Sequence, residues 1–144
     1  MEWLMNRPFY ETQADRRNEQ ELADIISSTY NCDLHKMPIK LSLDFMAMRD
    51  GKAVAFFEMR NRSNEMKGYP TYMLSLYKCM MAKLLHQTTG LPAFLAVQWT
   101  DVAGIVKIPP DNFTVEIGGT VRRNDPQDIE PMVYFNVSDF KIIK

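Results

Sequence analysis

Two acidic side chains stand out because each one interrupts an apolar stretch of the chain. Asp44 lies within the alternating apolar pattern of residues 39–48, and Glu58 comes near the end of the almost wholly apolar run 53–60. A carboxylate is costly to bury unless it has a partner, and a divalent cation is a natural partner for two carboxylates. Each residue alone could instead lie at a strand end and point into water. As a pair they indicate a cation site.

The surrounding sequence predicts the elements that would position these carboxylates. Apolar residues at helical spacing predict a helix over about 12–29. Alternation predicts a half-buried strand over 39–48, and the apolar run 53–60 is typical of a central strand. Asp50-Gly51 between them marks a hairpin turn. The two carboxylates are thus expected on neighbouring strands.

A second helix is expected after the polar loop 61–68. It would run over about 71–88 and end before Gly90. The apolar face expected for this helix consists of Met73, Leu76, Tyr77, Met80 and Leu84. Beyond it, the continuous apolar run 93–99 predicts a buried strand, and 105–108 is its expected hairpin partner.

Two further short strands are expected in the C-terminal part, over 113–117 and 132–137, with the charged loop 122–128 between them. The order of elements predicts an α/β fold with a central mixed β-sheet flanked by helices and a C-terminal β extension. The chain has the length of one ordinary domain, so we expect a single domain over residues 1–144. Its core would span about 12–108, and its C-terminal strands and loop would span 109–144.

The register of the predicted hairpin decides whether the two carboxylates can meet. With a two-residue turn at 50–51, Asp44 would lie opposite Phe57, and Glu58 would point to the other face of the sheet. A three-residue turn that includes Lys52, or a bulge in either strand, would bring Asp44 opposite Glu58. A shared cation site therefore requires one of these irregularities.

The arrangement resembles the PD-(D/E)XK nuclease superfamily, in which an aspartate and an E-x-K triad on adjacent strands bind the metal. Asp44 and Glu58-Met59-Arg60 stand at those positions. Glu19, on the preceding helix, stands where the family places a further glutamate. The resemblance covers most of residues 19–108 and is to small phage-type, Holliday junction resolvase-like proteins of this fold. It continues through Tyr72, Ser75 and Lys78 and then Gly90-Leu91-Pro92.

This resemblance implies a restriction-endonuclease-like αβββαβ core and a metal-dependent endonuclease that hydrolyses phosphodiester bonds, of a structure-specific, junction-resolving kind. It implies Mg²⁺, or Mn²⁺, held by Asp44 and Glu58, with Glu19 as a third ligand through water. The catalytic residues that it implies are Asp44, Glu58, Arg60, Glu19 and Lys78. The nucleic-acid-binding residues that it implies are Arg62, Tyr72 and Ser75.

One residue departs from the family pattern, because Arg60 stands where a lysine is expected. A guanidinium stays protonated at any relevant pH, so Arg60 could orient a water and stabilise phosphate charge but could not act as a general base. Lys78, on the face of the following helix with Ser75 and Ala82, is the candidate for a lysine that has migrated. A surface lysine or a phosphate contact is an equal alternative for Lys78.

The charge of the chain limits how it could bind nucleic acid. A formal net charge of −1 and a pI near 6.1 argue against a protein that coats nucleic acid by bulk electrostatics. Nucleic acid, with DNA ahead of RNA, is still the expected partner, so contact must be local. The basic side chains expected near the site are Arg60, Arg62, Lys67, Lys78 and Lys83.

The remaining composition predicts a cytoplasmic protein, in the host cytoplasm if a phage encodes it. No export signal is apparent, and no apolar run approaches the roughly 20 residues that a membrane helix needs. Cys32 and Cys79 have no partners at metal-ligand spacing and are expected to stay reduced. We also expect a homodimer, because small nucleases commonly pair so that two sites meet two strands.

Two other functions stay open. Because Arg60 replaces the lysine, the chain could be a catalytically silent protein of the same fold that binds nucleic acid without metal. It could also be a phage or bacterial protein-interaction domain in which the acidic pair is incidental. That alternative predicts neither metal binding nor a salt-dependent affinity for nucleic acid.

Overall fold

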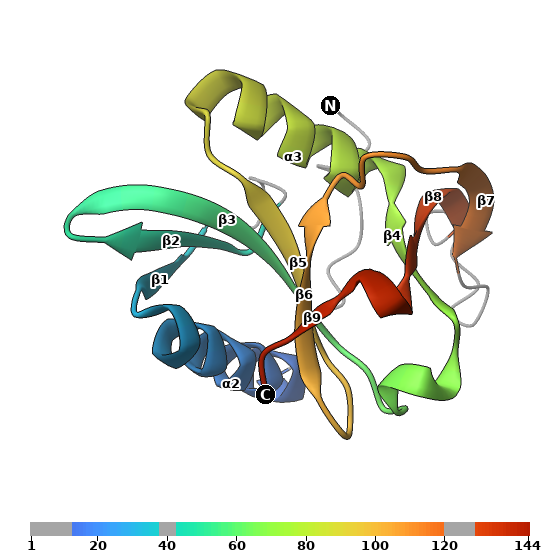
Figure 1. Cartoon of the computed structure of the whole chain (residues 1–144), viewed down its shortest axis with the longest axis horizontal. Coiled ribbons are helices and arrows are strands. Elements are labelled where there is room, and N and C mark those ends of the chain that lie inside the picture. Colours follow the sequence, from blue (N-terminus) through green and yellow to red (C-terminus); the bar gives the residue numbers. More distant parts are fainter. Residues whose placement is uncertain (1–12, 38–42, 120–128) are drawn as a thin grey trace.

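The computed structural model describes residues 13–37, 43–119 and 129–144 and has a mixed α/β fold (Figure 1). The described residues form two β-sheets and two α-helices. The helices are α2 (Gln13–Tyr30) and α3 (Leu76–Thr89), with short 3₁₀ turns at Met66–Gly68 and Val137–Asp139. The six-stranded sheet has the order β1 (Asp33–Lys36), β2 (Phe45–Arg49), β3 (Lys52–Asn61), β5 (Ala93–Gln98), β6 (Ala103–Ile108) and β9 (Lys141–Ile142). The three-stranded sheet has the order β4 (Thr71–Ser75), β8 (Ile129–Asn136) and β7 (Val115–Gly119).

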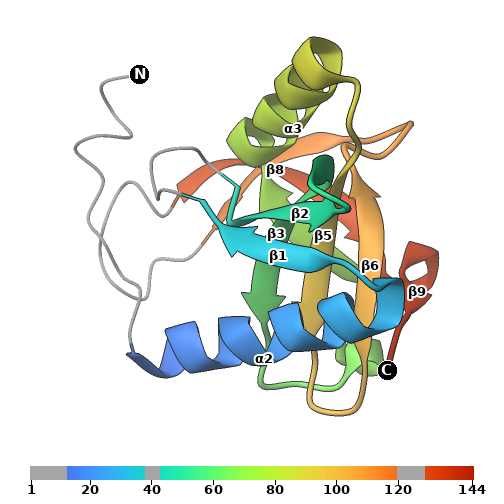
Figure 2. The ribbon, with the colours of Figure 1, turned by 90° about the vertical axis from the view of Figure 1, so that its left-hand side faces the viewer.

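The six-stranded sheet is covered on both faces, as the predicted mixed sheet with flanking helices requires. Helix α2 lies on one side of the sheet, and α3 with the three-stranded sheet lies on the other (Figures 1 and 2). The α2 side buries Leu22, Ala23, Ile26, Phe45, Ala47, Ala55, Phe57, Met59 and Ala96. The other side buries Phe56, Tyr72, Leu74, Cys79, Ala82, Leu95, Val97, Val133 and Phe135. Successive residues of β3 enter different cores, which explains why its sequence is continuously apolar.

The β2–β3 hairpin contains the irregularity that the site requires. Asp50 and Gly51 form a two-residue turn with φ values of 52° and 75°, the left-handed backbone of a type I′ turn. The register then shifts by one residue between Ala47 and Met48, which leaves Val54 of β3 as the extra residue of a bulge. The bulge is therefore the alternative that the structure confirms, and the three-residue turn is wrong.

Helix α3 is fixed at both ends on the connection between the parallel strands β3 and β5. At its start, the Ser75 hydroxyl accepts a hydrogen bond from the backbone N–H of Lys78 at 3.2 Å. At its end, Gly90 adopts a left-handed conformation with φ of 77°, and its N–H donates to the His86 carbonyl oxygen. These caps determine where Lys78 lies relative to β3.

The helix predicted over 71–88 begins too early. Residues 71–75 form strand β4, in which Tyr72 and Leu74 are buried while their neighbours face outward, an alternation with the period of a strand. The predicted apolar face of the helix is also wrong. Its buried residues are the small side chains Cys79 and Ala82, which allow the helix to pack closely. Met73, Met80 and Leu84 of the predicted face are 38%, 37% and 52% exposed.

The other predicted elements are present with shifted bounds. The first helix lies within one residue of its expected range, 12–29. The strand predicted over 39–48 is represented by β2 from Phe45, and residues 38–42 lie outside the described part. Strand β1 was not predicted, because Leu34 is the one partly buried side chain among its four. The strands predicted over 113–117 and 132–137 are β7 and β8. The charged loop 122–128 also lies outside the described residues.

Candidate active site

Asp44 is held immediately before β2 with its carboxylate turned toward β3. Its backbone N–H donates to the Phe57 carbonyl oxygen at 3.0 Å, and its Oδ2 accepts a hydrogen bond from the Met59 N–H at 2.8 Å. Phe45 pairs with Phe57, so continuing the register by one residue places Asp44 opposite Glu58. The bulge thus brings the two carboxylates to the same position along the hairpin.

Glu58 is the buried acidic residue of this site, with 0% of its surface exposed. It points from β3 toward α3, the same side as Phe56, and two cations meet it there. The Arg60 guanidinium forms an ion pair with Glu58 Oε2, and Lys78 Nζ lies 3.3 Å from Oε1. A buried carboxylate without such partners would be strongly destabilising. The two cations explain how the fold tolerates a glutamate in the core.

The Arg60 guanidinium lies among several oxygens of the site. Its Nη1 donates to the Met59 carbonyl oxygen at 2.9 Å and lies 3.8 Å from Asp44 Oδ2, in addition to its ion pair with Glu58. One nitrogen atom is therefore within reach of two carboxylates and one backbone carbonyl. The Met59 carbonyl was not among the predicted site groups, because a backbone oxygen leaves no signal in the residue type.

The pKa values in the site reflect burial and opposite charge. Burial raises the pKa of the Glu58 carboxyl above its usual range, although Arg60 and Lys78 act in the opposite direction. Burial alone would lower the pKa of Arg60, but the nearby Glu58 carboxylate, with Tyr72 and Asp44, raises it above its usual value. Arg60 therefore stays protonated, as expected for a guanidinium.

Tyr72, Arg62 and Ser75 lie around this centre in different ways. The Arg62 guanidinium stacks over the Tyr72 ring at 4.6 Å from its centroid. The Tyr72 ring is buried against Trp99 and Phe140, and its hydroxyl has no hydrogen-bond partner among the described residues. The Ser75 hydroxyl caps α3. The Tyr72 ring thus packs against the Arg62 guanidinium, and Ser75 positions the first turn of α3, which carries Lys78.

Glu19 lies on α2 and forms an ion pair with Lys36 of β1. Lys36 pairs in register with Phe45 and places its ammonium 5.3 Å from the centroid of that ring. Lys36 thus links Glu19 to Phe45, the residue that follows Asp44. Across residues 13–37, 43–119 and 129–144, no three His, Cys, Asp or Glu side chains are grouped to hold a metal ion. Glu19 therefore does not join Asp44 and Glu58 as a direct ligand within these residues, and its expected role through water stays a prediction.

The donor atoms at the hairpin nevertheless fit a divalent cation. The Arg60 Nη1 atom is surrounded by three oxygens, which are Asp44 Oδ2, Glu58 Oε2 and the Met59 carbonyl oxygen. These are the oxygen ligands that Mg²⁺ prefers. Glu58 Oε2 is buried, and the contact that occupies it is the ion pair with Arg60.

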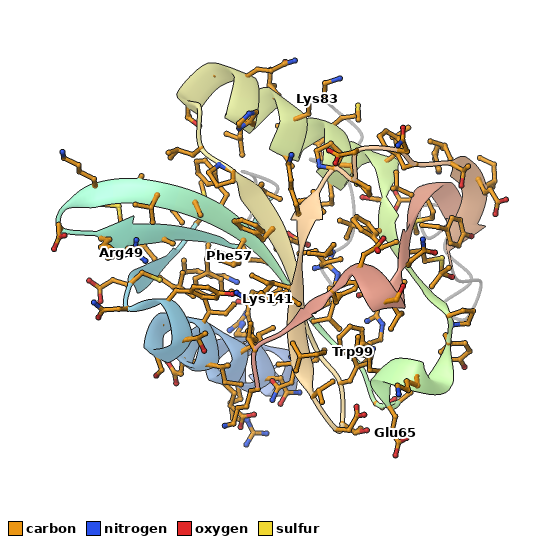
Figure 3. The ribbon with its side chains drawn as sticks, in the orientation of Figure 1. Arg49, Phe57, Glu65, Lys83, Trp99 and Lys141 are labelled. Carbon is orange, nitrogen blue, oxygen red and sulfur yellow. The ribbon has the colours of Figure 1, made fainter. Side chains whose placement is uncertain are left out.

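The predicted basic patch is divided among these roles. Arg60 and Lys78 are turned into the site against Glu58, and Arg62 lies over Tyr72. Lys83, one and a half turns further along α3, is exposed and points away from the sheet (Figure 3). Lys67 is exposed in the 3₁₀ turn Met66–Gly68.

Comparison with known proteins identifies the family. A family model described as "Phage putative PDDEXK endonuclease" matches residues 5–143. The chain belongs to this family. The resemblance expected from Asp44 and Glu58-Met59-Arg60 is thereby confirmed, and the chain is a member of a nuclease family. The individual roles of these residues stay predictions.

A solved structure shares the fold. Hjc, a Holliday junction resolvase from the archaeal hyperthermophile Archaeoglobus fulgidus, matches with a TM-score of 0.56 and 11% sequence identity. The match covers 90% of this chain and 88% of that chain. At this identity the likeness concerns the fold, and it confirms the predicted α/β class. No curated protein sequence matches the chain significantly. No helix in the described ranges is long and apolar enough to cross a membrane.

Proposed function

We propose that the protein is a Mg²⁺-dependent, or Mn²⁺-dependent, endonuclease that hydrolyses phosphodiester bonds in DNA. The observation that carries this proposal is the fully buried Glu58, which Asp44 faces across the hairpin while Arg60 and Lys78 supply two positive charges. Membership of a nuclease family supports the same conclusion. A glutamate held in the core by two cations is costly to maintain for structure alone.

Asp44, Glu58 and the Met59 carbonyl would hold the cation, and Glu19 would contribute through water. When bound, the cation would polarise the phosphate and lower the pKa of a water molecule. Lys78 would take the place of the family's lysine, since its Nζ lies 3.3 Å from Glu58 Oε1 although it comes from α3 rather than from β3. Arg60 and Lys78 would stabilise the charge that develops on the phosphate oxygens.

Contacts to the DNA backbone would come from the rim of the site. Arg62 is held by the Tyr72 ring, so its guanidinium is ordered for a phosphate contact. Tyr72 would act through Arg62, and Ser75 would act chiefly by holding the start of α3. These residues are proposed to bind the substrate and not to take part in bond breaking.

The substrate that we propose is branched DNA, such as a four-way junction. The printed description of the Archaeoglobus fulgidus neighbour as a Holliday junction resolvase favours this class, although the likeness itself concerns the fold. Cutting two strands would require two copies of the site, which favours a homodimer.

We also propose that residues 1–144 form one domain, because Leu95 of β5 and Val133 of β8 share one core. A location in the host cytoplasm would suit a phage nuclease.

A second candidate function is a silent DNA-binding protein, and Arg60 in the lysine position favours it. Its guanidinium cannot act as a base, so catalysis would depend on Lys78. If Lys78 serves only to neutralise Glu58, the protein would bind DNA without cutting it.

The test is cleavage of labelled branched and linear DNA with Mg²⁺, with Mn²⁺ and with EDTA. Wild type should cut only with metal, and Asp44→Asn and Lys78→Met should each lose most of this activity. Lys83→Met is the matched control, because Lys83 lies on the same helix as Lys78 but its side chain points away from the site (Figure 3). Metal-independent binding without cutting would support the silent protein. Absence of both binding and cutting would contradict either function.

A further inference from the structure

We propose that the Arg60 guanidinium occupies the cation position in the resting protein, so that Arg60 and a divalent cation compete for the same oxygens. This inference rests on the proposed metal-dependent function and adds a form of regulation to it. Arg60 would act as a tethered counter-ion that must leave before metal can bind.

The contacts of a single nitrogen atom carry the argument. Arg60 Nη1 donates to the Met59 carbonyl at 2.9 Å, pairs with Glu58 Oε2 and lies 3.8 Å from Asp44 Oδ2. Divalent cations bind such oxygens at about 2.0–2.6 Å. A cation at that distance from the same three atoms would overlap the guanidinium nitrogen and meet its positive charge. The two occupants therefore exclude one another.

The two cations on Glu58 differ in a way that makes an exchange feasible. Lys78 binds Oε1, whereas Arg60 pairs with Oε2, the oxygen that faces Asp44. Lys78 can consequently keep its contact while Arg60 leaves. The buried carboxylate would never be without a positive charge, and an unpaired buried carboxylate is the costly state.

Arg60 also has a route away from the carboxylates. Its side chain is 31% exposed, whereas that of Glu58 is fully buried, so the guanidinium lies toward the solvent side of the pair. Tyr72 is close enough to Arg60 to interact with it electrostatically. The Tyr72 hydroxyl is buried and makes no hydrogen bond to a described residue. That oxygen could accept a hydrogen bond from the displaced guanidinium.

Competition of this kind couples metal binding to substrate binding. A phosphate that attracts Arg60 outward vacates the oxygens for metal, and a bound metal releases Arg60 for the phosphate. By thermodynamic linkage, each ligand then raises the affinity of the other by the same factor. The protein would hold little metal until DNA arrives.

The test is calorimetric titration of Mn²⁺ into wild type, Arg60→Gln, Arg60→Met and Lys83→Met. Arg60→Gln removes the charge but keeps a side-chain N–H toward Glu58, and Lys83→Met controls for the loss of one positive charge. A hydrogen bond to a charged group contributes about 1.5–3 kcal/mol, so both Arg60 variants should bind Mn²⁺ on the order of tenfold more tightly than wild type. Lys83→Met should match wild type. Arg60 variants with equal or weaker Mn²⁺ affinity would overturn the proposal.

A second measurement on unaltered protein covers the case in which the Arg60 variants do not fold. The ¹⁵Nε signal of Arg60 should shift on titration with Mg²⁺ and sharpen as the side chain is released, whereas that of Arg49 should not. An unchanged Arg60 signal in protein that binds Mg²⁺ would also overturn the proposal. Failure of this inference is distinct from failure of the proposed function. Metal-dependent cleavage by wild type with unaltered Mn²⁺ affinity in Arg60→Gln would reject competition and leave the nuclease in place.

Discussion

Lys78 Nζ lies 3.3 Å from the buried Glu58 Oε1, although one residue comes from helix α3 and the other from the interior of strand β3. The Ser75 cap sets the start of α3 and so sets the position of Lys78. Helix and sheet are thereby joined at the site by charge as well as by apolar packing.

The Lys78–Glu58 pair should contribute to stability as a coupled unit. We expect Lys78→Met to lower the free energy of unfolding by about 1–3 kcal/mol, because it removes a charge-assisted hydrogen bond from a buried carboxylate. In a Glu58→Gln background the same substitution should cost much less, because no charge remains to be neutralised. Urea denaturation of the four proteins in the cycle measures this coupling. Additive effects would show that the two side chains do not interact.

Burial raises the pKa of Glu58, and this should be visible in the pH dependence of stability. At low pH the Glu58 carboxyl is protonated in both the folded and the unfolded protein, so it adds no pH dependence to the free energy of unfolding. As pH rises through the unfolded value of about 4.3, the unfolded chain releases its proton while the folded chain retains it. Stability relative to Glu58→Gln should therefore fall as pH rises from that value to the folded pKa. If wild type instead gained stability relative to Glu58→Gln over this pH range, Arg60 and Lys78 would lower the pKa of Glu58 more than burial raises it.

Cys79 should be unreactive in the folded protein. It is fully buried, and burial raises the pKa of its thiol to about 12, so almost no thiolate is present at neutral pH. Cys32 is partly exposed. A disulfide exchange reagent should label one thiol per native chain and two after denaturation. If native Cys32→Ser reacted as fast as the denatured variant, the placement of Cys79 would be wrong.

Deletion of Val54 should keep the two carboxylates together. Val54 is the unmatched residue, because Met48 pairs with Ala53 and Ala47 pairs with Ala55, so its removal leaves a regular two-residue hairpin in which Asp44 still lies opposite Glu58. We expect this variant to fold by circular dichroism and to bind Mn²⁺ with about the wild-type affinity. Val54→Ala keeps the bulge and should bind Mn²⁺ as wild type does. Loss of Mn²⁺ binding in a folded deletion variant would show that the bulge itself, and not only the pairing of Asp44 with Glu58, is required.

The sequence predicted elements well where one apolar period was unbroken, as in α2 and in the run that became β3. It failed where the apolar period changed from that of a strand to that of a helix within one continuous run of residues. Tyr72 and Leu74 alternate as in a strand but lead directly into α3, so the two elements were merged. The buried face of α3 was missed because small residues pack against the sheet while Leu84 remains in solvent.

The site was predictable in its residue types and not in its contacts. Asp44, Glu58 and Arg60 follow from a motif on adjacent strands, and Lys78 follows from its place on the next helix. Nothing in the sequence indicates that Arg60 would contact the Met59 carbonyl oxygen, because that depends on a rotamer and on a backbone atom. The ion pair of Glu19 with Lys36 was missed for a similar reason, since β1 itself was not predicted.

The bulge in β3 decides which residue numbers can face one another in this hairpin. Around a regular two-residue turn, facing residues always combine one odd and one even position, as Arg49 and Lys52 do. Asp44 and Glu58 are both even, so only a hairpin with one unmatched residue can make them face one another. Lengthening or shortening this hairpin by two residues, one in each strand, would keep the carboxylates together. Loss of one residue would keep them together only where it removes the bulge, and gain of one residue would need a compensating change elsewhere in the same hairpin.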